Sequence, residues 1–343
     1  MNAHYLSHHI FNFHHVIWIT GLSSGKTVWS TSPPAWSGSL STQPSCCNNQ
    51  GVTCGSIPGT ASYASVQSIV LNYLGLVGTL PFEIGYFRSC AVFVMGTNTV
   101  TGSIPNSIGT MTSMQYLDLG YNSMRGTIPS GFGNMQSLAV MLLFDNKLTG
   151  TIPSSLGSLT KLTDFYLNSN LLSGRIPETL GNMRSLSVFS VFDNYLIGTI
   201  PTVLSNLRPL TTFYIDYNSL TGSIPAGIFA LPSLQFIHLS YNSLTGPIPN
   251  TIGSLTLLQY LDMRYNFLTG GVPSSFSGLT SLSILLLRSN YLTSGGPAIL
   301  PTSTFALATQ EGTLDLAENC LNYVSLTNPL QSTEPSNCKP PGV

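Results

Sequence analysis

Residues 97–105 read TNTVTGSIP, and this nine-residue stretch returns along the chain at a fixed interval. Copies include YNSMRGTIP at 121–129 and YNSLTGSIP at 217–225. Its asparagine recurs every 24 residues, from Asn98 to Asn290. Self-similarity at one short period is the signature of a solenoid, because a single repeat cannot bury its own apolar face and must stack on its neighbours.

Each repeat has a fixed pattern of residue types around the asparagine. Apolar residues lie eight, five and three positions before it, as Met114, Leu117 and Leu119 do before Asn122. The alternation predicts a short strand with one buried face. The asparagine is expected to turn inward, where its amide can satisfy backbone groups at the bend. A glycine follows after four residues and a proline after seven, which indicates a special backbone angle and then an extended segment without an α-helix.

The repeats define the expected organisation of the chain. We expect an α/β solenoid of about eleven turns, with a parallel inner sheet and outer turns that are irregular or short 3₁₀ helices. The domains are expected to be an N-terminal segment (1–35), an N-terminal cysteine cap (36–65), the repeats (66–319) and a C-terminal cysteine cap (320–343).

The repeat pattern LxxLxLxxNxLxGxIPxxLGxL resembles the plant-specific class of leucine-rich repeats. This resemblance implies a right-handed superhelix with a concave parallel β-sheet and a second short sheet after each strand. It extends to the ectodomains of receptor-like kinases, to polygalacturonase-inhibiting proteins and to the leucine-rich-repeat surface antigens of protists.

Five of the six cysteines flank the repeats. The segment CCNNQGVTC (46–54) resembles the N-terminal cap of the plant family, although Asn49 stands where that family has tryptophan. The resemblance implies a Cys47–Cys54 disulfide. The pair Asn319-Cys320 resembles the C-terminal cap, for which Cys338 is the expected disulfide partner. Disulfide caps indicate an oxidising compartment, and therefore an extracellular or cell-surface protein.

Two cysteines have no assigned partner. Cys46 would pair upstream in the plant family, and no upstream cysteine exists here. Cys90 occupies the leucine position eight residues before Asn98. We expect Cys90 to be a small buried hydrophobe, with a reactive thiol or a bond to Cys46 as the less favoured alternatives.

Composition and short motifs exclude several functions. Charged residues make up 7% of the chain and the net charge is −1, so nothing attracts nucleic acid or an anionic membrane over a distance. GLSSGKT (21–27) has three residues between its glycines, where a phosphate loop has four, and Pro33 and Pro34 prevent a following helix. The N-terminal histidines lack cysteine or acidic companions. We therefore expect no cofactor, no metal site and no transmembrane span.

The N-terminus is a poor match to a secretory signal, because no basic residue precedes the short apolar run at 16–19. The true N-terminus, and whether the chain is a fragment of a membrane receptor, therefore stay open.

Positions six, four, two and one before each asparagine are expected to point away from the core. Aromatic residues and aspartates predominate there, and rigid aromatic side chains and arginine commonly carry binding energy. The candidate ligand-binding residues are Tyr116, Asp118, Tyr166, Phe192, Tyr214, Asp216, Phe236, His238, Tyr241, Tyr260, Asp262, Arg264 and Arg288. Alternatively, the tyrosines only pair across neighbouring strands and the acids only solubilise the face.

These residues favour binding over catalysis. Asp216, His238 and Asp262 lie in successive repeats and could form an acid–base group, but no nucleophile motif accompanies them and an open sheet does not exclude water. We expect a non-catalytic module that binds a protein, peptide or glycan on the concave face. The alternatives are a structural or adhesive surface coat without a specific ligand, and an intracellular scaffold. The sequence leaves the ligand and the oligomeric state open.

Overall fold

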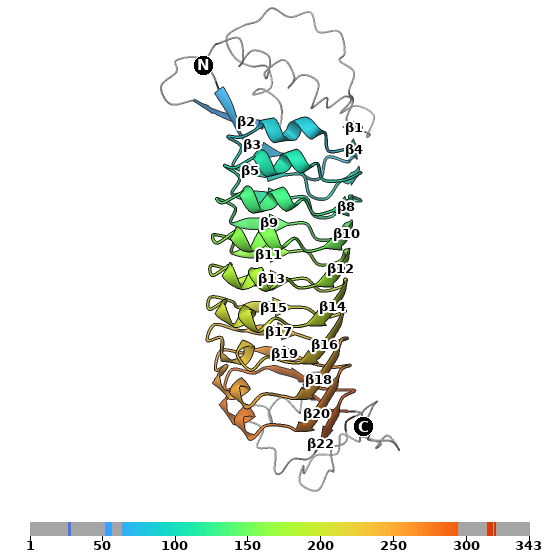
Figure 1. Cartoon of the computed structure of the whole chain (residues 1–343), viewed down its shortest axis with the longest axis vertical. Coiled ribbons are helices and arrows are strands. Elements are labelled where there is room, and N and C mark those ends of the chain that lie inside the picture. The colour runs from blue at the N-terminus through green and yellow to red at the C-terminus, as the bar shows by residue number, and fades with distance from the viewer. Residues whose placement is uncertain (1–26, 29–51, 57–63, 294–313, 318, 320–343) are drawn as a thin grey trace, which may run out of the picture. The chain divides into compact units, whose positions relative to one another are not determined.

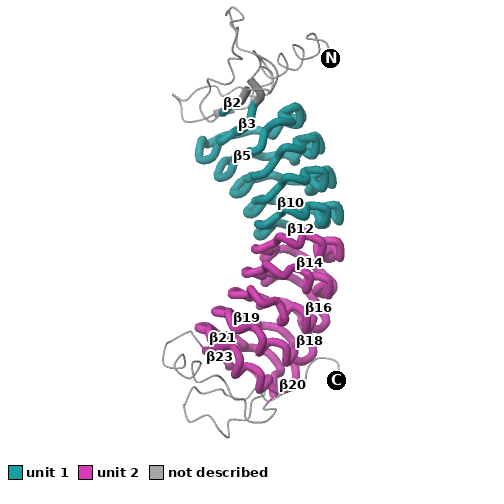
Figure 2. Tube along the Cα trace, turned by 90° about the vertical axis from the view of Figure 1, so that its left-hand side faces the viewer, with its two compact units in different colours: residues 1–171 teal, residues 172–343 magenta. Residues whose placement is uncertain are grey.

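The computed structural model describes residues 27–28, 52–56, 64–293, 314–317 and 319 (Figure 1). The chain divides into two compact units, residues 1–171 and 172–343, which are coloured separately in Figure 2 and are taken in turn. Cys47, Cys320 and Cys338 lie outside the described residues, and the side chain of Cys54 is not described. Both cap disulfides therefore remain predictions, as do the domain limits.

In the first unit, one sheet is built from the short strand that precedes each asparagine. Its parallel strands pair in sequence order with matched registers, for example Leu117 with Met141. β2 pairs with β3 antiparallel. The strands are β2 (Val52–Ser56), β3 (Ala64–Val70), β5 (Val92–Val94), β7 (Tyr116–Asp118), β9 (Val140–Leu142) and β11 (Asp164–Tyr166).

The second unit repeats this parallel arrangement. Phe213 pairs with both Phe189 and Ile237, so each repeat adds one strand in register. The last described pair joins Leu285 to Leu314. The strands are β13 (Val188–Ser190), β15 (Thr212–Tyr214), β17 (Phe236–His238), β19 (Tyr260–Asp262), β21 (Ile284–Leu286) and β23 (Leu314–Asp315).

A second set of parallel strands follows the asparagines, as the resemblance implied. In the first unit these strands are β4 (Leu76–Thr79), β6 (Thr99–Thr101), β8 (Arg125–Thr127) and β10 (Lys147–Thr151). The short strand β1 (Thr27–Val28) precedes the repeats and pairs with β4 in parallel. β12 (Leu171–Arg175) begins at the last residue of the first unit. The second unit contains β14 (Tyr195–Thr199), β16 (Ser219–Ser223), β18 (Ser243–Pro247), β20 (Phe267–Gly271) and β22 (Tyr291–Thr293).

Short 3₁₀ helices form the remaining side of the repeats, which confirms that prediction. Nearly all begin directly after a proline in extended conformation, such as Pro249 before η9. η8 instead follows Gly227, and in this repeat Phe229 stands where other repeats have glycine or serine. The helices are η2 (Phe82–Tyr86), η3 (Asn106–Thr110), η4 (Ser130–Asn134), η5 (Ser154–Ser158), η6 (Glu178–Asn182), η7 (Thr202–Asn206), η8 (Ile228–Ala230), η9 (Asn250–Ser254) and η10 (Ser274–Gly278).

The predicted core positions are buried. Met114, Leu117 and Leu119 have no exposed surface, and neither do their equivalents across most repeats. Cys90 is likewise fully buried and unpaired, and burial raises the pKa of its thiol to about 11. A thiol that holds its proton this firmly is a poor nucleophile, which agrees with the expectation of a small buried hydrophobe.

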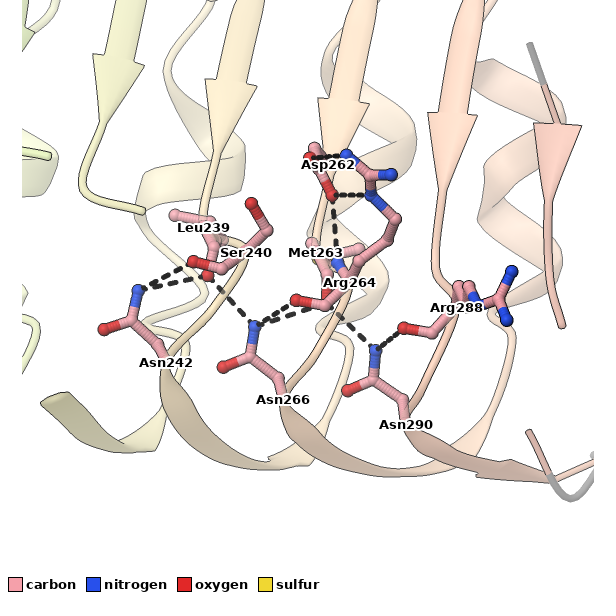
Figure 3. A network of polar contacts seen from close by, with 9 residues as sticks. All are labelled: Leu239, Ser240, Asn242, Asp262, Met263, Arg264, Asn266, Arg288 and Asn290. Atoms are coloured by element: carbon pink, nitrogen blue, oxygen red, sulfur yellow. Dashed lines mark hydrogen bonds and ion pairs between the residues drawn. The ribbon is translucent and has the colours of Figure 1, made fainter. Parts of the chain in front are cut away.

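The asparagines form a ladder of hydrogen bonds between repeats, as predicted. The Nδ2 group of Asn242 donates to the carbonyl oxygens of Ile215 (3.0 Å) and Leu239 (3.2 Å). Its Oδ1 accepts from the amide of Leu220 at 2.9 Å. Asn266 and Asn290 repeat the arrangement in the following turns (Figure 3). Each side chain therefore satisfies backbone groups that the bend leaves unpaired.

Candidate ligand-binding face

The candidate residues lie on the outward side of the strands that precede the asparagines. In the second unit, strand register aligns Tyr214 with His238 and His238 with Asp262. The same pairing aligns Phe236 with Tyr260. Side chains that are 24 residues apart in sequence are therefore direct neighbours on one surface, which we call the strand face of the second unit.

Aromatic rings form a continuous row across this strand face. His238 lies between Tyr214 and Tyr260, with ring centroids 4.3 Å and 4.4 Å away, and the ring of Tyr260 is nearly parallel to it. Phe192 contacts Tyr214 edge to face at 6.5 Å. We call these four residues the strand ladder. Burial lowers the pKa of His238, so its imidazole is neutral at pH 7.

A second row of rings follows the residues directly before the asparagines. Tyr217, Tyr241 and Tyr265 stack with successive centroids 4.3 Å apart and interplanar angles of 13° and 23°. Their exposed fractions are 51%, 37% and 36%. We call them the turn ladder. Of the three, only Tyr241 is among the sequence-based candidates.

The turn ladder depends on an unusual backbone conformation. The φ angles of Tyr217, Tyr241 and Tyr265 are 50°, 51° and 52°. This left-handed region is uncommon for residues other than glycine. The sequence pattern predicted a special φ for the later glycines, and Gly246 has a φ of 76°. The pattern gave no indication of a positive φ at the position before the asparagine, where tyrosine, aspartate, serine and threonine all occur.

Between the two ladders the surface is recessed and acidic. Asp216, Ser240 and Asp262 are only 8%, 2% and 2% exposed. All three lie at positions that were expected to point away from the core, and yet they are nearly buried. Neighbouring strands lie about 4.8 Å apart, so long side chains at adjacent positions shield a shorter side chain from solvent. We call these three residues the floor.

The two acids of the floor have opposite electrostatic environments. Arg264 folds onto Asp262, with its Nη2 2.9 Å from Oδ2, and this hydrogen-bonded pairing raises the pKa of Arg264 (Figure 3). The Oδ1 atom of Asp216 is buried and has no hydrogen-bond partner among the described residues. Burial raises the pKa of Asp216 to about 7, and the charges of Asp262 and Asp193 add to this effect.

The strand face of the first unit is built differently. Phe144 contacts Tyr121 at 5.0 Å and Tyr166 at 6.1 Å, and it lies over Gly120, where a Cβ atom would come within 2.9 Å of the ring. The carboxylate of Asp118 accepts the amide proton of Gly120 at 2.9 Å, although burial raises the pKa of Asp118. Phe144 occupies an expected outward position, two residues before Asn146, but it was not among the candidates.

The structure does not assemble an acid–base group from Asp216, His238 and Asp262. The ring of His238 is stacked between tyrosines, and both oxygens of Asp262 accept hydrogen bonds from Arg264. Among the described residues, no group of three histidine, cysteine or acidic side chains could hold a metal ion. In the same part of the chain, no helix has the length and apolarity needed to cross a membrane.

The remaining candidates are Tyr116 and Arg288, the second of which is half-buried. Phe236 and Tyr260 have been placed above by their strand pairing. Tyr116 lies on β7, and burial raises its pKa, with Asp118 and Asp164 contributing. The guanidinium of Arg288 points away from the Asp262–Arg264 pair in Figure 3. None of the thirteen candidates is shown to touch a ligand, so their role in binding stays a prediction.

Stacked parallel strands, an asparagine ladder and 3₁₀ outer turns together define a leucine-rich-repeat solenoid. The family model described as Leucine Rich Repeat matches residues 113–135, 161–183, 233–255 and 257–279. The chain is a plant-type leucine-rich-repeat protein, similar to the ectodomains of plant receptor kinases.

Solved structures of plant receptor kinases resemble this chain. The ectodomain of the receptor kinase GASSHO1/SCHENGEN3 from Arabidopsis thaliana, in complex with CASPARIAN STRIP INTEGRITY FACTOR 2, is 35% identical over 80% of this chain and 32% of its own, with a TM-score of 0.73. The Arabidopsis receptor kinase HAESA, in complex with the peptide hormone IDA and the co-receptor SERK1, is 32% identical. The match covers 80% of this chain and 49% of the HAESA chain, with a TM-score of 0.65.

The chain therefore spans about a third to a half of these receptors. A plant ice-binding protein, 23% identical over 81% of this chain and 86% of its own with a TM-score of 0.65, shares the fold alone. No match is found among curated proteins.

Proposed function

We propose that this chain is a non-catalytic recognition module that binds a peptide, or an extended segment of a protein, on its strand face. The observation that carries the proposal is the pair of aromatic ladders on either side of the acidic floor in the second unit. The similar plant receptors whose structures contain the peptides RGF2 and IDA support this class of ligand. The similarity to the ectodomain of a plant membrane receptor kinase supports a place outside the cell or at its surface.

The ladders have the properties of a binding surface. Tyrosine offers a large rigid contact area at a small cost in conformational entropy, and its hydroxyl can bond a peptide backbone. Stacking holds each ring in place before any ligand arrives, so less order must be imposed on binding. Tyr217 remains 51% exposed in spite of its stacking.

The main alternative, a surface coat without a specific ligand, explains the floor less well. A coat protein needs only soluble side chains on this surface. A carboxyl group that is nine-tenths buried and lacks a partner on Oδ1 is costly to fold, so its presence needs a reason. Titratable groups in unfavourable buried environments are concentrated at functional sites.

Panning the purified chain against a displayed library of random 12-residue peptides tests the proposal. Enriched peptides are synthesised, and their affinities are measured for the wild type and for a Tyr214→Ala/Tyr217→Asn/Tyr241→Asn variant. Asparagine is chosen at 217 and 241 because it tolerates the left-handed conformation. We expect at least a tenfold loss of affinity in this variant.

The control removes equally exposed apolar surface from the other sheet. Tyr195 and Ile197 on β14 are 62% and 50% exposed, and a Tyr195→Ser/Ile197→Thr variant leaves the strand face intact. This control is expected to bind as the wild type does. Equal loss in both variants, or no enriched peptide at all, would contradict the proposed function.

A further inference from the structure

The floor of the strand face contains one carboxylate that has a cationic partner and one that does not. Asp262 accepts two hydrogen bonds from the guanidinium of Arg264, from Nε at 3.0 Å and from Nη2 at 2.9 Å. Asp216 is also nearly buried, at 8% exposed, yet its Oδ1 has no partner among the described residues. The two acids lie two repeats apart in the same unit.

The surroundings of Asp216 are negative or neutral. The carboxyl groups of Asp193, in the preceding repeat, and of Asp262 both disfavour its ionisation. His238 is held neutral by burial. Burial also raises the pKa of Tyr260, and the charges of Asp262 and Asp216 add to that effect. The charge of Arg264 is taken up by Asp262, and no basic group is among those that shift the pKa of Asp216.

Aromatic rings lie next to this carboxyl group along the chain. Tyr214 of the strand ladder precedes Asp216 by two residues and Tyr217 of the turn ladder follows it directly. The faces of tyrosine rings attract ammonium and guanidinium groups, and the attraction grows when the site is shielded from water. Carboxylates bind guanidinium groups through paired hydrogen bonds.

We infer that Asp216 receives the cationic side chain of an arginine or lysine of the bound peptide, between the strand ladder and the turn ladder. This inference rests on the proposed function and specifies the chemistry of its ligand. A guanidinium would supply to Asp216 what Arg264 already supplies to Asp262. Because the raised pKa of Asp216 means that binding must ionise it, affinity for such a peptide should increase as the pH rises through 7.

A metal ion fits the site less well than a basic side chain. Calcium takes about six to eight oxygen ligands, whereas no cluster of three acidic, histidine or cysteine side chains occurs among the described residues. The nearby carboxylate of Asp193 is exposed, so water would compete with a metal ion for it.

The experiment compares peptide affinities at pH 8 for the wild type, for Asp216→Asn and for the control Asp164→Asn, which removes a charge from β11. The probes are peptides enriched on the wild type from the 12-residue library. Each arginine is replaced by citrulline and each lysine by acetyl-lysine, one at a time. Both replacements remove the positive charge, and citrulline also keeps the shape of arginine. Circular dichroism verifies that each variant is folded.

We expect one basic residue whose neutralisation weakens binding to the wild type and to Asp164→Asn by at least tenfold. The same neutralisation should weaken binding to Asp216→Asn by less than twofold. Wild-type binding that survives every neutralisation, or an equal loss in Asp216→Asn, would overturn the inference. If those peptides still depend on Tyr214, Tyr217 and Tyr241, the proposed function stands without it.

Discussion

Arg264 is clamped onto Asp262, two residues before it on the same chain. Its Nε lies 3.0 Å from Oδ1 and its Nη2 lies 2.9 Å from Oδ2, and its own amide donates to Oδ1 at 3.0 Å (Figure 3). This local pair neutralises one acid of the floor and leaves Asp216 as the acid without a basic partner. The strand face therefore contains one acid, Asp216, that differs from the other in lacking a counter-charge, although the net charge of the whole chain is close to zero.

Replacing Arg264 by glutamine should destabilise the fold by about 2 kcal/mol, because the Asp262 side chain is 3% exposed and would lose its counter-charge. The double variant Asp262→Asn/Arg264→Gln should recover part of the loss, since no unpaired charge then remains. Urea denaturation measures both. A single variant as stable as the wild type would show that the pair contributes nothing.

Asp216 should make stability depend on pH. Its folded-state pKa of about 7 exceeds its ordinary value of 3.8, so between these values the folded chain holds a proton that the unfolded chain has lost. Stability from this group is therefore present below pH 4 and falls as the pH rises through 7.

The matched variant is Asp216→Asn, which cannot ionise. It should equal the wild type near pH 4 and exceed it at pH 8, by at most about 4 kcal/mol at 1.36 kcal/mol per pKa unit. The opposite effect of His238 is common to both proteins and cancels in the comparison. Denaturation midpoints at a series of pH values test this, and parallel curves would refute it.

Asn242→Ala should cost about 3 kcal/mol or more, because it leaves several buried backbone groups unpaired, including the amide of Leu220. The control Asn250→Ala changes an exposed asparagine at the start of η9 and should alter stability by less than about 0.5 kcal/mol. Similar midpoints for the two variants would contradict a structural role for the asparagine ladder.

Gly253→Ala should destabilise the chain by roughly 1–3 kcal/mol. A Cβ atom at residue 253 would lie 2.3 Å from the backbone carbonyl oxygen of Ser275, so a repeat would have to shift. Ser205 holds the same position in an earlier repeat, and Ser205→Ala should cost less than about 1 kcal/mol, since only an exposed hydrogen bond to Thr202 is lost. Thermal denaturation of both variants distinguishes these outcomes.

Much of the fold is predictable because the residue types and their spacing within each repeat specify its local structure. The alternation of Leu117 and Leu119 predicted a half-buried strand, and both are fully buried on either side of an outward-facing Asp118. The inward turn of Asn122 followed from the need to pair backbone groups at a bend, and its amide donates to Met95 in the preceding repeat. Such rules depend only on spacing within a repeat, so one sequence contains them.

The binding face was predictable only as a set of positions. Asp216 and Asp262 occupy outward positions, yet both are buried, and only one has a counter-charge. Tyr217 and Tyr265 complete a stack that no property of their own repeats distinguishes.

The sequence by itself determined the repeat, the core and the strand that carries each outward side chain, because these follow from periodicity within one chain segment. Only the tertiary structure decided which of those side chains are stacked, paired, or buried without a partner. The physical reason is that the neighbours of each side chain come from repeats 24 residues away, at the close spacing of adjacent strands. Whether Asp216 is solvated or recessed depends on those neighbours rather than on its own position.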